Sequence, residues 1–189
     1  MTRCEWALTS EALLDYHDTE WGVPVYDDRK LFEFLVLDGF QAGLSWAIIL
    51  NKREAFRNAF DDFNPEIIAS YSEKKISELL VNPAIVRNKM KINAAVRNAQ
   101  AYLDLMERVS SFSEYLWQFV DGKPLVHSYS GWSEIPAKSA ESEKMSKSLQ
   151  KDAFMFTGPT ICYAFMQAAG MINDHVIDCF RRDEIISEY

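Results

Sequence analysis

Two pairs of residues near opposite ends of the chain are of types that bind metal ions. His175 and Cys179 are four positions apart in "MINDHVIDCF", a spacing that places both side chains on one face of a helix. Near the other end, Cys4 lies in "RCEW" and His17 in "DYHD". Zinc takes four such ligands, and a site filled by protein alone has no open position for water. Each residue could equally be an ordinary buried side chain, so spacing alone leaves both interpretations open.

The other cysteine and histidine lack such partners. Cys162 lies in the apolar stretch "TICYAFMQAA" and is expected in the core, whereas His127 lies in an irregular, exposed segment. Three cysteines, an odd number, argue against a disulfide framework. The N-terminal residues "MTRCEWALTS" have no apolar core of a signal peptide, and no apolar run reaches membrane-spanning length. We therefore expect a cytoplasmic protein with reduced thiols and no membrane partner.

A second pattern combines aromatic rings with a carboxylate. In the sequence, Tyr16 and Trp21 lie close to His17. Trp6 lies close to Cys4. In "LVLDGFQAGLSW", Asp38 comes near the end of an apolar helix, where the helix dipole disfavours a carboxylate, and Trp46 follows a turn. Asp38 could simply face solvent, with Trp46 in the core. A pocket built from these residues would instead suit a flat, electron-poor ring with N–H donors, such as a cationic purine.

The elements that must position these residues are helical. Apolar residues recur at helical spacing almost throughout, and alternating strand patterns are nearly absent. The expected helices cover residues 27–39, 44–60, a short segment from Pro65, 73–80, 84–106, 111–120, 139–152 and 159–169. The length of 189 residues and the 48% hydrophobic composition predict one all-α domain over residues 1–189, with its two ends packed together.

Charge distribution bears on nucleic-acid partners. A net charge of −8 argues against a protein that coats nucleic acid non-specifically. Locally, residues 79–103 carry four basic side chains and no acidic one. Lys144, Lys147 and Lys151 share one face of the predicted helix 139–152. Solvated helix faces would explain both patterns, and a local phosphate-binding surface would explain them equally.

Three segments together resemble a known family. "CEWA…YHDTEWGVP", "LFEFLVLDGFQAGLSW" and "FTGPTICYAFMQAAGMINDHVIDC" resemble DNA-3-methyladenine glycosylase I, in order from Cys4 to Cys179. The resemblance implies a helix-hairpin-helix fold, with that unit at about residues 139–170. It implies one structural zinc ion per chain, held by Cys4, His17, His175 and Cys179. It also implies a monomeric enzyme that hydrolyses the N-glycosidic bond of 3-methyladenine in alkylated double-stranded DNA, without lyase activity.

The resemblance further assigns roles around a flipped base. Trp46 would stack on the base, and Asp38 would accept hydrogen bonds from its edge as the candidate catalytic residue. The remaining residues predicted to surround the base are Trp6, Tyr16, Trp21 and Phe40.

Other residues would contact the DNA duplex. Leu44 would act as a wedge in the base stack. The hairpin over residues 153–159, with Thr157 and Gly158, would present backbone N–H groups to a phosphate. The lysines expected to flank that phosphate are Lys144, Lys147 and Lys151.

The chain also departs from the family pattern. Asp38 stands where the family usually has Glu, so its carboxylate reaches about 1.5 Å less far. Phe40 and Leu13 stand where polar residues are frequent, which suggests a less polar and differently sized pocket. Either the base sits deeper, or a water bridges Asp38 to it, or the preferred lesion differs. Asp174, the nearest counterpart of the aspartate that helix-hairpin-helix glycosylases generally use, is interpreted as a helix cap. The alternative function is a non-catalytic module that recognises alkylated or distorted DNA.

Overall fold

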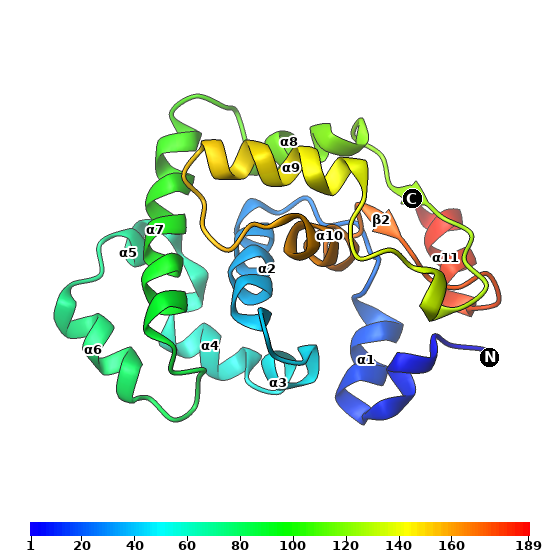
Figure 1. Cartoon of the computed structure of the whole chain (residues 1–189), viewed down its shortest axis with the longest axis horizontal. Helices are drawn as coiled ribbons and strands as arrows, with labels where there is room; N and C mark the ends of the chain where they lie inside the picture. Colours follow the sequence, from blue (N-terminus) through cyan, green and yellow to red (C-terminus); the bar gives the residue numbers. More distant parts are fainter.

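The protein, described here by a computed structural model of residues 1–189, is built almost entirely of helices (Figure 1). The α-helices are α1 (Glu11–Thr19), α2 (Asp28–Gln41), α3 (Trp46–Leu50), α4 (Arg53–Ala59), α5 (Pro65–Ala69), α6 (Glu73–Val81), α7 (Lys89–Met106), α8 (Phe112–Trp117), α9 (Ala140–Lys151), α10 (Pro159–Ala168) and α11 (Phe180–Glu188). Four 3₁₀ helices are η1 (Glu5–Thr9), η2 (Asp61–Phe63), η3 (Gln118–Val120) and η4 (Trp132–Glu134). The strands β1 (Leu125–Val126) and β2 (Ile172–Asn173) form one short parallel pair. The predicted all-α class is confirmed.

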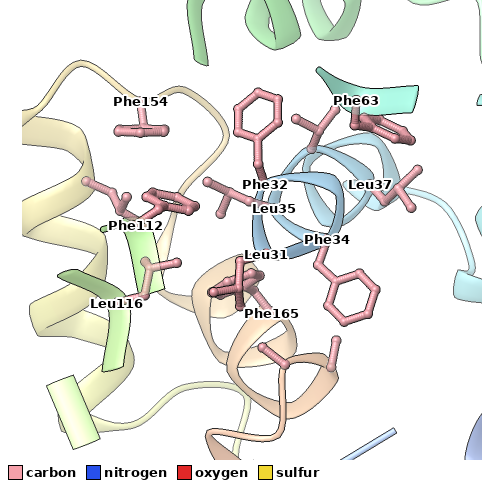
Figure 2. Close-up of a cluster of buried hydrophobic side chains, with 14 of the residues drawn as sticks. Leu31, Phe32, Phe34, Leu35, Leu37, Phe63, Phe112, Leu116, Phe154 and Phe165 are labelled. Carbon is pink, nitrogen blue, oxygen red and sulfur yellow. The ribbon is translucent and has the colours of Figure 1, made fainter. Parts of the chain in front are cut away.

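Helix α2 lies at the centre of the hydrophobic core. Every residue from Leu31 to Phe40 is buried, because α2 is covered on all sides by other helices, including α7, α8 and α10. Figure 2 shows Phe112 of α8 and Phe165 of α10 among the rings and branched side chains around α2. The helix that carries Asp38 is therefore held rigidly.

Helix starts follow the capping residues that the sequence offers. The side chain of Asp27 accepts a hydrogen bond from the Lys30 N–H group at 2.8 Å and begins α2. Ser139 and Ser142 form a reciprocal capping box that begins α9. These contacts explain why both helices begin within a residue or two of the predicted positions.

Several helices differ from the sequence-based expectation. The predicted helix over 44–60 is divided into α3 and α4 at Asn51–Lys52, where the Lys52 ammonium donates to the Ala84 carbonyl at 3.0 Å. The predicted helix over 84–106 begins only at Lys89, because the Asn88 side chain caps it. Helices α1 and α11 were not predicted.

The two chain ends meet, as predicted. The Phe180 N–H group donates to the Thr2 carbonyl at 3.1 Å, and Figure 1 shows both termini at the same end of the molecule, beside α1 and α11. No helix is both long enough and apolar enough to cross a bilayer.

Helices α9 and α10 are joined by a hairpin of residues 152–158. Two residues in it, Ala153 and Phe156, have positive φ values of 66° and 54°. Asn98 of α7 holds the hairpin through both of its amide atoms, accepting from the Met155 N–H group at 2.7 Å and donating to the Met155 carbonyl at 3.0 Å. The hairpin is thus anchored against α7.

Candidate active site and metal centre

The four cysteine and histidine residues near the chain ends converge on one point. All four side chains are buried, and their ligand atoms lie within 4.8 Å of one another. The Cys179 sulfur is 3.4 Å from both His17 Nε2 and His175 Nδ1, and those two nitrogens are 3.2 Å apart. Tetrahedral zinc, with bonds of about 2.0–2.3 Å, separates its ligands by about 3.3–3.8 Å. The spacing of these donor atoms suits such an ion.

Groups outside the cluster orient its rings. His17 Nδ1 lies 2.7 Å from the Asp18 carboxylate, which Arg3 holds from the other side at 2.8 Å. His175 Nε2 donates to the Trp21 carbonyl at 3.0 Å. Each ring therefore turns its other nitrogen toward the cluster, the arrangement that metal-binding histidines usually have.

Of the two thiols, Cys179 is the one prepared for metal binding, whereas its hydrogen bond with Cys4 raises the pKa of the Cys4 thiol. Hydrogen bonds from the Cys4 thiol, then from His17 and His175, lower the pKa of the Cys179 thiol. A thiolate is the form that binds metal. Because the chain supplies all four donors and none is exposed, the cluster suits a structural ion rather than a catalytic one.

The local structure around His175 and Cys179 corrects one prediction. The two residues do not share a helix: they lie in the segment between β2 and α11, and Cys179 is the residue that precedes α11. A turn, closed by the Cys179 N–H group donating to the Val176 carbonyl at 2.8 Å, brings their side chains together.

An aromatic pocket of about 530 Å³ adjoins the cluster. The Trp21 ring is 4.5 Å from the His175 ring between centroids, so a pocket wall rests directly on a ligand. Helices α1, α2, α3 and α10 supply most of the lining, with η1 and η4. The residues that line the pocket include Trp6, Leu13, Tyr16, Trp21, Asp38, Gln41, Trp46, Trp132, Ala164, Gln167 and Ala168.

Asp38 lies in this pocket and does not face solvent. It occupies the last turn of α2, is only 3% exposed, and its Oδ2 atom has no hydrogen-bond partner. Burial away from water raises the pKa of Asp38 well above its usual range. Burial and the neighbouring Asp38 likewise raise the pKa of Tyr16.

Two further buried polar atoms around the pocket lack partners. They are the indole N–H groups of Trp6 and Trp46. Buried polar groups in folded proteins are nearly always hydrogen-bonded, so three unpartnered groups on residues of one pocket indicate a ligand site. The Tyr16 and Trp46 rings, 5.5 Å apart between centroids, offer faces for a flat ligand.

Most of the residues predicted for the base site come together here, and one does not. Trp6, Tyr16, Trp21, Asp38 and Trp46 all line the pocket, as does Leu13. The prediction for Phe40 is wrong. Two positions after Asp38 on the same helix, its ring points into the core and lies 4.7 Å from the Phe56 ring. Phe40 therefore contributes to the core rather than to the pocket.

Trp132 and Gln167 are among the pocket residues that were missed from the sequence. Trp132 belongs to η4 in the irregular segment, where no periodicity marks it, and its ring lies 6.0 Å from that of Trp6. Gln167 lies on the buried face of α10. A glutamine within the apolar run "ICYAFMQAA" was a usable signal, because a polar side chain in a buried helix needs a partner.

Asp174 is not a helix cap, because no helix begins there. Its carboxylate is fully buried and lies 2.6 Å from His127 Nδ1, 2.6 Å from the Tyr163 hydroxyl and 2.7 Å from Gln167 Nε2. His127, predicted to be exposed and alone, is partly buried, and its hydrogen bond to Asp174 raises its pKa. Cys162 lies in the core, as expected.

The residues predicted to contact DNA are mostly accessible. Leu44 is exposed in the turn after α2, and Lys144, Lys147 and Lys151 are exposed on α9. Thr157 is an exception: its side chain is buried, and its hydroxyl donates to the Phe154 carbonyl at 3.2 Å. The predicted contact of Thr157 with DNA, through its backbone N–H group, does not involve this side chain and stays a prediction.

The backbone at the end of the hairpin remains available. The N–H groups of Thr157 and Gly158 donate no hydrogen bond within the protein, and Gly158 directly precedes α10. Unpaired N–H groups at the start of a helix attract anions.

Comparison with known proteins gives relatives over nearly the full length. DNA-3-methyladenine glycosylase of Haemophilus influenzae is 43% identical over 178 residues, 94% of this chain and 96% of the relative. DNA-3-methyladenine glycosylase 1 of Escherichia coli is 44% identical over 179 residues, 95% of this chain and 96% of the relative.

Solved structures agree in fold. A crystal structure of 3-methyladenine DNA glycosylase I, 44% identical, superposes with a TM-score of 0.92 over 95% of this chain and 98% of that one. A structure of 3-methyladenine DNA glycosylase I from Staphylococcus aureus, which describes 3-methyladenine recognition, is 38% identical with a TM-score of 0.92, over 96% of this chain and 97% of that one. The family model for methyladenine glycosylase matches residues 6–182, and the chain therefore belongs to the methyladenine glycosylase family.

Proposed function

We infer that this protein hydrolyses the N-glycosidic bond of 3-methyladenine in alkylated DNA and releases the free base. Relatives 43–44% identical over nearly their full length carry this name, and so do structures of the same fold. The observation that carries the inference is the Asp38 carboxyl, buried without a partner in a pocket of aromatic rings.

The pocket explains how such a base is selected. Alkylation gives adenine a positive charge, which makes it a good leaving group and weakens its pairing, so extruding it from the duplex costs less. Inside the pocket, the cation stacks on Trp46, and Tyr16 forms a wall beside it. An ionised Asp38 attracts it, and this attraction offsets the desolvation that raises the Asp38 pKa in the empty pocket. A neutral base would not offset the desolvation of an ionised Asp38.

We further propose that one zinc ion per chain is held by the cysteine and histidine cluster. Its support is the separation of the donor atoms, their complete burial and the outer contacts of both rings. Bound there, zinc would cross-link the two ends of the chain. Trp6 and Trp21 contact the rings of His17 and His175, so the cross-link would keep these pocket walls in place.

The DNA surface is proposed around the hairpin and the turn after α2. These segments are neighbours, since the Phe156 Cβ lies only 3.4 Å from where a side chain on Gly39 would begin. The N–H groups of Thr157 and Gly158 would bind a phosphate, as in a helix-hairpin-helix unit. Lys151 ends α9 beside the hairpin, whereas Lys144 lies two turns earlier. Leu44, 37% exposed, remains the candidate wedge.

To test the proposed activity, the purified protein is incubated with methylated duplex DNA. The released bases are then separated by chromatography. Free 3-methyladenine should appear and rise with enzyme concentration, and the strand should stay uncut because the enzyme has no lyase activity. The alternative, a non-catalytic module, predicts tight binding to the same DNA with no base released.

A further inference from the structure

Gln167 is a further buried polar residue, besides Asp38, in the lining of the candidate base pocket. Gln167 of α10 lines the pocket between Ala164 and Ala168 and is only 7% exposed. Its Nε2 atom donates to Asp174 at 2.7 Å, and this is the one hydrogen bond that the side chain makes within the protein, so its Oε1 atom takes part in none. One end of this amide is thus fixed and the other is free.

The hydrogen-bond network decides which end is free. The Gln167 Nε2 atom lies 2.7 Å from Asp174 Oδ2, so the amide turns its NH₂ group toward this carboxyl oxygen, which accepts the hydrogen bond. His127 and Tyr163 donate to the same carboxylate at 2.6 Å each, which holds Asp174 in position. The Gln167 carbonyl oxygen, at the other end of the amide, is therefore a free hydrogen-bond acceptor on a residue that lines the pocket.

We propose that Gln167 determines specificity for a 6-amino purine, with its Oε1 atom accepting a hydrogen bond from the exocyclic amino group of the flipped base. This rests on the proposed function. The amino group of 3-methyladenine has two hydrogens, and Asp38 and Gln167 offer acceptors from the neighbouring helices α2 and α10. A purine with a carbonyl at that position would place two acceptors against each other and would be rejected.

The experiment measures the dissociation constants of the full-length protein for free 3-methyladenine and for 3-methylhypoxanthine, its 6-oxo analogue. The wild type should bind 3-methyladenine more tightly. Gln167→Met keeps the side-chain length but removes the acceptor, and should lower the ratio of the two affinities roughly threefold to tenfold, the size of one hydrogen bond.

Gln100→Met is the matched control. It makes the same chemical change at an exposed side chain on α7, outside the pocket, and should leave the ratio within about twofold of the wild type. Gln167→Glu should retain selectivity near pH 6, because its protonated carboxyl can donate to Asp174 and turn its carbonyl oxygen to the pocket. This variant provides the test if Gln167→Met does not fold.

Three results would overturn the proposal. They are an unchanged ratio in folded Gln167→Met, lost selectivity in Gln167→Glu, and equal binding of both bases by the wild type. Base release from methylated DNA by the wild type is measured separately. A selective pocket without release would therefore count against the proposed activity and leave the role of Gln167 standing.

Discussion

Two polar sites lie side by side in this molecule, and they differ in how their polar atoms are satisfied. In the cysteine and histidine cluster, both rings are fixed on the outside, by Asp18 and by the Trp21 carbonyl, and all four donors point at one another. In the neighbouring pocket, Asp38 and two indole N–H groups are buried without any partner. Unsatisfied polar groups cost stability, so the comparison indicates that the cluster supports the fold and that the pocket is kept open for a ligand.

Removal of a cluster ligand should have the largest effect. Cys179→Ala leaves three donors, so we expect the zinc content to fall from about one ion per chain and the free energy of unfolding to fall by roughly 3 kcal/mol or more, since zinc binding to structural sites contributes about 10–16 kcal/mol. Metal analysis and denaturant unfolding measure these two quantities.

Cys162→Ala is the control for that loss. It removes a buried cysteine of the core that is not part of the cluster, and should cost about 1 kcal/mol while the zinc content stays unchanged. If the two variants lost equal stability and kept equal metal, the cluster would have no structural metal role.

Substitution of Asp38 should separate stability from function. Asp38→Asn should weaken binding of free 3-methyladenine about 10- to 100-fold, the usual size of a hydrogen bond to a charged group. The same substitution should raise the melting temperature at neutral pH, because it removes an ionisable group that burial disfavours in its charged form. Titration calorimetry and thermal unfolding test both. A variant less stable than the wild type, with unchanged binding, would mean that Asp38 supports the fold.

The pH dependence of base release should follow the ionisation of Asp38. Burial raises the pKa of this carboxyl, so the folded protein holds its proton to a higher pH than the unfolded chain does. Release should therefore fall as the pH falls through the raised pKa, while the stability of the wild type relative to Asp38→Asn should increase over the same range. Rate and unfolding profiles of both proteins between about pH 4 and 8 show whether the two trends oppose each other. Parallel trends would contradict the assignment.

The lysines of α9 should give the smallest effect. Lys151→Ala, beside the hairpin, should weaken binding to any duplex and lower the salt dependence of the binding constant by about one unit of slope, as expected for one lost phosphate contact. Lys144→Ala, two turns away, should change the slope less. Titrations of duplex DNA at several salt concentrations compare the two variants, and identical slopes would remove the hairpin from the proposed DNA surface.

The sequence predicted the class of the fold and much of the site because those features are local. Residue type identified Cys4, His17, His175 and Cys179, and helical periodicity placed α2 and α10. The turn that joins His175 to Cys179 was not predicted, because a spacing of four fits a helix equally well.

Features that depend on tertiary contacts could not be predicted. Trp132 reaches the pocket from a segment without periodicity, and Asp174 is bound by His127 from that irregular region as well as by Tyr163 and Gln167 of α10. Phe40 was misplaced because the family pattern marks a position without fixing which face of α2 it occupies. On a helix that is buried on all sides, the surroundings of each side chain are decided by the helices packed around it.

The most direct test of this account is the single-turnover rate of 3-methyladenine release from methylated duplex DNA by Asp38→Asn and wild-type protein, compared at equal zinc content. The account predicts that the variant keeps its metal and its fold and releases the base at least about tenfold more slowly, because the attraction to the cationic base is lost. Equal rates would contradict the claim that the open pocket, through Asp38, carries the chemistry.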